Sequence, residues 1–134
     1  MRYLLDTHII MWALIDDPHL PKKFRDILLD QNNQIYYSAV SAWETEVKHL
    51  KRPDYFFVSG KQLANLCEQV GFLKIPVENR HIEELHNIKP LDESVKHEDP
   101  FDKMLMAQAR SENMILLSHD KKLRNYADEH VMVC

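Results

Sequence analysis

Short apolar runs alternate with helix-like segments along the whole chain of 134 residues, and this alternation limits the folds available to it. Runs of three to four mostly apolar residues are typical of strands that are buried on both faces of a sheet. Parallel strands need a crossover segment between them, so the alternation favours an α/β fold with a mainly parallel sheet. The five runs are Arg2–Leu5, Gln34–Tyr37, Phe72–Ile75, Met114–Leu117 and Val131–Val133.

Apolar residues at helical spacing predict helices between these runs. The stretch Ile9–Ile15 follows the first strand directly, and the clearest pattern is residues 99–113 (DPFDKMLMAQARSEN), with a shorter helix predicted over 121–129 (KKLRNYADE). Segments 51–60 and 90–99 are predicted loops. Further helical stripes are Phe24, Ile27 and Leu28; Val40, Trp43, Val47 and Leu50; Leu63, Leu66, Cys67 and Val70; and Ile82 with Leu85. Because neither a repeat nor a boundary interrupts the pattern, we expect a single domain spanning residues 1–134.

Composition excludes several classes of protein. With only two glycines, the chain cannot contain the glycine-rich loops that cradle nucleotide phosphates. Two cysteines make no disulfide framework, and the longest apolar run is too short to span a bilayer. The N-terminus does not follow the pattern of a secretory signal, so we expect a soluble, cytoplasmic protein. A net charge of −4 argues against nucleic-acid binding by the protein's charge alone, although bound cations would reverse the local sign.

Acidic residues recur where strands end and helices begin, which is the edge that carries the chemistry in open α/β sheets. Asp6 ends the first strand, and Asp120 follows the fourth by two residues; each could simply cap a helix. Glu44 shares its helical stripe with valines, an unusual position for a solvated acid, although an (i, i+4) pair with Lys48 is an alternative explanation. Glu46, two residues later, lies on a different side of the predicted helix, and we expect it to be an ordinary surface acid.

Two more acids begin the strongest helix. Asp99 before Pro100 is typical of an N-cap followed by a proline at the first helical position. Asp102 suits the helix dipole, but it is in register with Leu105 and Met106 on the buried stripe, where an unpartnered charge is costly.

Carboxylates gathered at one edge repel one another and raise one another's pKa, and a divalent cation relieves that repulsion. Carboxylate oxygens suit Mg²⁺ or Mn²⁺, and Mg²⁺ held this way keeps waters that can be activated to attack a phosphodiester. The sequence therefore predicts a metal centre built from Asp6, Glu44, Asp102 and Asp120.

Four segments in order, LLDTH, SAWE, HEDPFDKMLMAQA and LLSHD, resemble the PIN domain and, more closely, the VapC-type toxins of bacterial toxin–antitoxin pairs. The resemblance implies a PIN-like three-layer sandwich, in which a five-stranded sheet of order 3-2-1-4-5 is flanked by helices. It implies a Mg²⁺- or Mn²⁺-dependent endoribonuclease, an antitoxin partner and a homodimer. It also implies that the four acids named above are catalytic, metal-binding residues, supported by Thr7, Asp99 and Ser118.

Basic residues that could contact RNA lie near two of these acids. Their alternative role is that of solvated helix ends. They are Lys121, Lys122 and Arg124 after Asp120, and Lys48, Lys51 and Arg52.

Other functions remain possible at this point. A PIN-like nuclease could act on rRNA precursors or DNA, and a non-catalytic α/β binding domain would use its acids only as caps. A haloacid-dehalogenase-type phosphatase needs a second acid two residues after the first, where this chain has His8.

Overall fold

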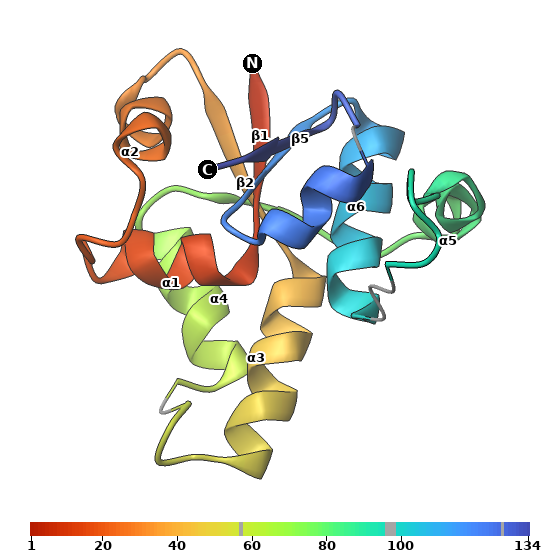
Figure 1. Ribbon diagram of the computed structural model, residues 1–134. Helices are drawn as coiled ribbons and strands as arrows, with labels where there is room; N and C mark the ends of the chain where they lie inside the picture. The colour runs from red at the N-terminus through yellow and green to blue at the C-terminus, as the bar shows by residue number, and fades with distance from the viewer. Residues whose placement is uncertain (57, 96–98, 127) are drawn as a thin grey trace.

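The computed structural model describes residues 1–56, 58–95, 99–126 and 128–134, and its centre is a parallel five-stranded sheet (Figure 1). The strand order β3-β2-β1-β4-β5 confirms the expected topology. β1 lies in the middle because it pairs with both β2 and β4, so that Leu4 has Tyr36 and Leu116 as its two neighbours. The strands are β1 (Arg2–Leu5), β2 (Gln34–Ser38), β3 (Leu73–Ile75), β4 (Ile115–Ser118) and β5 (Val131–Val133).

Helices occupy the crossovers between the strands, as the periodicity predicts. Two short 3₁₀ helices, η1 (Leu85–Asn87) and η2 (Lys121–Tyr126), accompany them. The α-helices are α1 (Thr7–Leu14), α2 (Lys22–Leu29), α3 (Ala39–Lys51), α4 (Gly60–Gln69), α5 (Asn79–Glu84) and α6 (Pro100–Glu112).

The last predicted helix, over residues 121–129, is corrected by the structure to the shorter 3₁₀ helix η2. Its buried side chains, Leu123 and Tyr126, are three residues apart. A period of three places them on the same side of a 3₁₀ turn, so both reach the core. Ala127 lies outside the described residues, as do Phe57 and residues 96–98 in the two predicted loops.

The sheet is covered on both faces. Successive side chains of a strand point to opposite faces. Tyr3 and Leu5 pack with α1, α2 and α4, whereas Leu4 between them packs with α6. In Figure 1, α1 and α4 lie on one side of the strands and α6 on the other, with α5 beyond α6. This arrangement is the expected three-layer sandwich.

Helix α3 departs from its predicted stripe. Val40 is buried, but Trp43 is 60% exposed and Leu50 is 71% exposed. The reason is that α3 extends past the edge of the sheet, where α4 is its neighbour (Figure 1). The two helices approach so closely that a Cβ at Gly60 would collide with a backbone carbonyl of α3. Glu46 is not the ordinary surface acid expected, because its carboxylate accepts a hydrogen bond from the Gly60 N–H at 3.1 Å.

Three helices begin with a side-chain cap at the sheet's carboxyl edge or close to it. Asp6 caps α1, Ser38 caps α3 and Asp99 caps α6, each accepting from backbone N–H groups of its own helix. The edge therefore brings together the starts of helices that are distant in sequence. Within the described residues, no helix has the length and apolarity needed to cross a membrane.

Candidate active site

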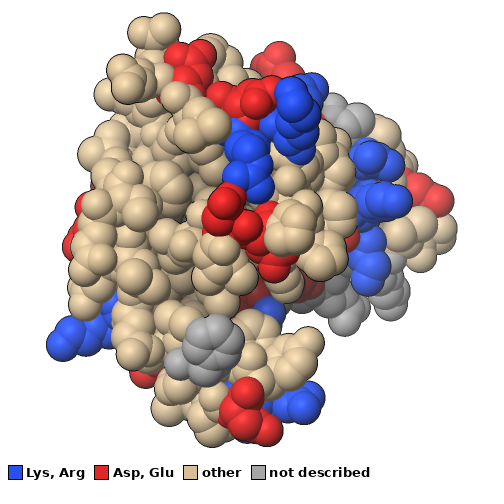
Figure 2. Space-filling view, turned by 90° about the vertical axis from the view of Figure 1, so that its left-hand side faces the viewer, with Lys and Arg blue, Asp and Glu red and all other residues tan. Residues whose placement is uncertain are grey.

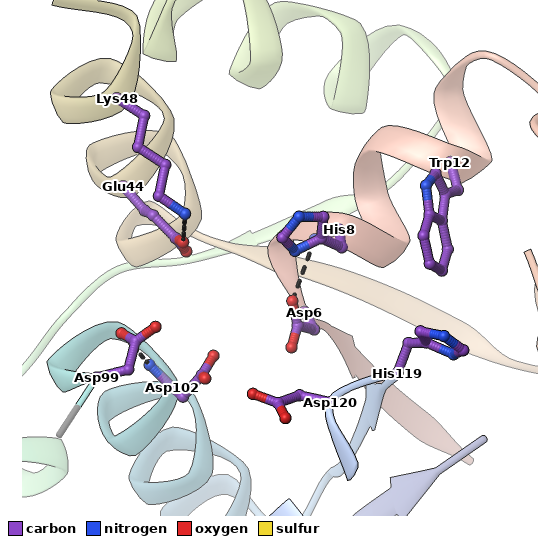
Figure 3. Close-up of a pocket in the computed structure, with 9 residues that line it drawn as sticks. All are labelled: Asp6, His8, Trp12, Glu44, Lys48, Asp99, Asp102, His119 and Asp120. Carbon is purple, nitrogen blue, oxygen red and sulfur yellow. Dashed lines mark hydrogen bonds and ion pairs between the residues drawn. The ribbon is translucent and has the colours of Figure 1, made fainter. Parts of the chain in front are cut away.

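A pocket of about 360 Å³ opens at the carboxyl edge of the sheet (Figure 3). It collects side chains from β1, α1, α3, α6 and the segment after β4. All four acids predicted as metal ligands line it, together with the acid predicted to support them. The lining residues are Asp6, His8, Trp12, Glu44, Lys48, Asp99, Asp102, His119 and Asp120.

Asp6 is a helix cap and a pocket residue at the same time. Its Oδ1 accepts from the backbone N–H of His8 at 3.1 Å, and its Oδ2 accepts from the Ser118 hydroxyl at 2.8 Å. Burial raises the pKa of Asp6, while these two hydrogen bonds act in the opposite direction. The capping explanation is therefore correct but incomplete, because a cap alone would not need a buried carboxyl facing other acids.

Glu44 is nearly fully buried and has a defined partner for each oxygen. The Thr7 hydroxyl donates to Oε1 at 2.7 Å, and Lys48 Nζ lies 2.6 Å from Oε2. Thr7 also shares a 2.9 Å hydrogen bond with the hydroxyl of Ser41. The (i, i+4) pair with Lys48 that the sequence offered as an alternative does form, inside the pocket. Thr7 does not line the pocket; it positions Glu44 from behind.

Asp102, like Asp6, has a raised pKa. Burial raises its pKa to about 8, and the neighbouring carboxylates of Asp6, Asp99, Glu44 and Asp120 add to the shift. Asp99 Oδ1 accepts from the Asp102 backbone N–H at 3.3 Å, so the cap of α6 also fixes the first turn that presents Asp102. Mutual repulsion among these acids is thus a property of the folded chain, as predicted.

Asp120 lines the pocket just after β4, and Ser118, the last residue of that strand, supports it. Ser118 is fully buried, and besides donating to Asp6 it accepts from the Asp120 backbone N–H at 3.1 Å. Asp120 Oδ1 accepts from the Lys122 backbone N–H at 3.0 Å, so the predicted capping role is also present. One buried hydroxyl therefore ties the acid after β1 to the acid after β4.

The donor set fits a hard divalent cation, since carboxylate oxygens surround one cavity, and burial together with their mutual repulsion raises the pKa of Asp102. Among the described residues, no three His, Cys, Asp or Glu side chains are placed to hold a metal ion by themselves. Mg²⁺ is usually bound by one or two carboxylates, waters and substrate phosphates rather than by a complete protein cage. Asp6, Glu44, Asp102 and Asp120 are the residues that would hold it.

The predicted RNA-contacting cations divide into two groups. Lys48 lines the pocket, whereas Lys121, Lys122 and Arg124 are exposed on η2 and do not line it. Arg52 lies 5.2 Å from the ring centroid of Tyr55 at the far end of α3. Figure 2 shows Asp and Glu gathered near the middle of this face, with Lys and Arg above them and in a separate group at its right-hand side.

The pocket also has an aromatic wall, which consists of His8, Trp12 and His119. The sequence places the two histidines beside the predicted acids, but it did not indicate that they meet Trp12. The ring centroids of Trp12 and His119 are 5.1 Å apart, and those of Trp12 and His8 are 6.2 Å apart. The signal that could have found it is the spacing of His8 and Trp12, which places both on one face of α1.

A comparison with known protein families identifies the fold. The family model of the PIN domain matches residues 3–129 of this chain. The chain belongs to the PIN domain family. The match spans the segments that supply all of the pocket's acids, from Asp6 to Asp120.

Solved structures similar to this PIN domain share its fold at low sequence identity. VapBC2 from Rickettsia felis, bound to a DNA fragment from its promoter, matches with a TM-score of 0.68 and 17% identity over 100% of this chain and 98% of that chain. VapBC-1 from nontypeable Haemophilus influenzae gives 0.66 and 19%, covering 99% and 98%. FitAcB from Neisseria gonorrhoeae gives 0.60 and 21%, covering 97% and 96%. No curated protein matches this PIN domain significantly.

Proposed function

We propose that this PIN domain, residues 1–134, is a divalent-metal-dependent endoribonuclease of the cytoplasm and the toxin of a toxin–antitoxin pair. The observation that carries the proposal is the single pocket shared by Asp6, Glu44, Asp102 and Asp120, which come from four separate parts of the chain. PIN domains are generally nucleases and generally use divalent metals, which supports the same assignment. Helix capping alone does not predict that these four acidic side chains line the same cavity.

Each acid has a part in this proposal. A bound Mg²⁺ or Mn²⁺ supplies the charge that attracts a phosphodiester and lowers the pKa of a water. Asp6, Asp102 and Asp120 would hold that ion, directly or through waters. Glu44, fixed by Thr7 and Lys48, would be a further ligand or would orient the attacking water. Hydrolysis would then leave a 5′-phosphate and a 3′-hydroxyl.

The proposal includes two protein partners. The fold shared with VapBC and FitAcB complexes supports an antitoxin. Exposed apolar residues away from the active-site pocket support a homodimer: Leu29, Val70 and Leu73 line one surface hollow between α2, α4 and β3. Light scattering of the isolated chain would test the dimer, and a monomer at micromolar concentration would refute it.

The decisive experiment is an RNA cleavage assay with purified protein and total RNA in Mg²⁺, Mn²⁺ or EDTA. We expect cleavage only with a metal, and at least a 100-fold loss in the Asp6→Asn variant, about the upper range for residues that merely support ligands. Asparagine is also a good N-cap, so α1 should persist in that variant. The matched control is Asp26→Asn on the exposed face of α2, which should cleave like the unmodified protein.

The same assay separates the competing functions. Parallel reactions contain single-stranded and duplex DNA, and cleavage confined to DNA would replace the ribonuclease with a deoxyribonuclease. Metal-dependent cleavage that survives Asp6→Asn would remove the pocket from the mechanism. If neither nucleic acid is cut and metal does not raise the melting temperature, the acids serve only as caps.

A further inference from the structure

The aromatic wall is built by contacts that have no part in holding a metal. Besides His8 and His119, the half-buried ring of Trp12 meets His19, with centroids 5.8 Å apart and planes inclined by 27°. Trp12 is thus in contact with three imidazoles, two of which line the acid pocket with it (Figure 3).

The turn after α1 fixes the fourth ring of this group. The backbone N–H of Asp17 donates to the Trp12 carbonyl at 2.9 Å, which closes the chain back onto the helix. Asp17 Oδ1 then accepts from the His19 backbone N–H at 2.8 Å and lies 2.7 Å from its Nδ1. The preceding Asp16 has a positive φ of 51°, a conformation that non-glycine residues adopt at a cost. Backbone geometry and side-chain bonds therefore place His19 against the indole.

The wall stands opposite the acids that would engage a phosphate. In Figure 3, Trp12 and His119 lie on one side of Asp6 and Asp120, and Glu44 and Asp99 lie on the other. A phosphodiester held at the acids has nucleosides attached on both sides, so one of its bases comes next to the wall. Ring faces attract bases regardless of sequence, whereas a base inside a duplex is already stacked and paired.

We propose that His8, Trp12 and His119 form a stacking subsite for one unpaired base beside the scissile phosphate. The inference rests on the ribonuclease function proposed above and adds the residues that receive a base. Trp12 is the positioning residue, and the imidazoles of His19 and His119 hold its ring.

Tryptophan fluorescence tests this subsite without requiring cleavage. The chain has two tryptophans, so Trp43→Phe leaves Trp12 as the only reporter. This variant is titrated in Mg²⁺ with short oligo(A), oligo(U) and oligo(C), and with the oligo(A)·oligo(U) duplex, and the signal is recorded immediately on mixing. We expect the single strands to quench Trp12 and the duplex to leave it unchanged.

Binding of the same oligonucleotides to Trp12 variants provides the second readout. Trp12→Leu keeps apolar volume without a ring face and should bind about 5- to 100-fold more weakly, the range that corresponds to the loss of one stacked base. Trp12→Phe should recover most of the affinity, which a purely structural role of the indole would not predict. Far-ultraviolet circular dichroism of both variants confirms that they are folded.

The outcomes distinguish this inference from the ribonuclease proposal. Quenching by single strands without any cleavage in Mg²⁺ or Mn²⁺ would keep the subsite and remove the nuclease. Cleavage with an unquenched Trp12, or equal quenching by duplex and single strand, would overturn the subsite and keep the nuclease. Quenching by an apolar peptide but by none of the RNAs would make the wall a protein-docking surface and also overturn the proposal.

Discussion

The hydroxyl of Ser118 donates to Asp6 at 2.8 Å and accepts from the backbone N–H of Asp120 at 3.1 Å, so one buried atom positions acids that follow two neighbouring strands. We expect Ser118→Ala to weaken Mn²⁺ binding about 10- to 100-fold, as is typical when a partner of a metal ligand is lost. Calorimetric titration measures the effect. Ser118→Thr should retain most of the affinity, and Ser111→Ala on α6 is the control. Unchanged binding in Ser118→Ala would show that Asp6 needs no support.

The pKa of Asp102 predicts how the metal-free protein responds to pH. Because the pKa rises from 3.8 to about 8 on folding, this carboxyl favours the folded state fully below about pH 4, and its contribution is lost as the pH rises through 8. The Asp102→Asn variant lacks this carboxyl, so its stability should not fall as the pH rises through 8. Each unit of pKa difference corresponds to about 1.4 kcal/mol, so about 6 kcal/mol is the upper bound, and near pH 8.5 the variant should be more stable by several kcal/mol.

Urea unfolding in EDTA at about pH 5 and pH 8.5 measures this difference. The exposed-site variant Asp26→Asn should keep the wild-type pH dependence, since its carboxylate is far less buried. Adding Mg²⁺ should stabilise the wild-type protein at the higher pH and leave Asp102→Asn largely unaffected. A wild-type stability that does not fall between the two pH values would contradict the predicted repulsion.

Thr7 is predicted to act through the orientation of Glu44. Thr7→Val keeps the shape of the side chain but removes the 2.7 Å hydrogen bond to Glu44, leaving one oxygen of a buried carboxylate without its donor. We expect kcat for RNA cleavage to fall about 10-fold, with KM little changed, because substrate binding does not involve Thr7. Thr7→Ser should restore activity. An equal loss in the valine and serine variants would point to packing rather than to the hydroxyl.

Lys48 is predicted to compete with the metal for Glu44. Its Nζ lies 2.6 Å from Oε2 and 5.4 Å from the ring centroid of Phe56, so the cation is held within the pocket. Lys48→Met should therefore tighten Mn²⁺ binding several-fold while destabilising the metal-free protein. Calorimetry and thermal melting in EDTA measure the two effects. Lys61→Met on α4 is the control, and weaker metal binding in Lys48→Met would show that the lysine assists the site instead.

Much of the architecture could be predicted because it follows from local patterns. Apolar runs of three to four residues between helical stripes predict parallel strands, and the acids that end or follow those strands must share an edge. That is why Asp6 and Asp120 could be placed near each other although 113 positions of chain separate them. The strand order itself came from the resemblance to PIN domains, because periodicity does not say which strands are neighbours.

Features that depend on tertiary contacts could not be predicted in this way. The stripe containing Trp43 has helical periodicity, yet its exposure depends on how far α3 projects beyond the sheet. The hydrogen bond from the Gly60 N–H to the Glu46 carboxylate depends on how closely α4 approaches α3. The pairing of Trp12 with His119 joins α1 to the segment after β4, and a single sequence contains no signal for such a contact.

The central position of β1 has a consequence for the timing of synthesis. Asp6 emerges from the ribosome first, but its strand is paired on one side by β4 and its carboxylate is held by Ser118, which are made near the end. A nascent chain that stops before β4 has Asp6, Glu44, Asp99 and Asp102 but lacks Ser118 and Asp120. The pocket of the proposed enzyme is therefore complete only after β4 and the segment that carries Asp120 have been made.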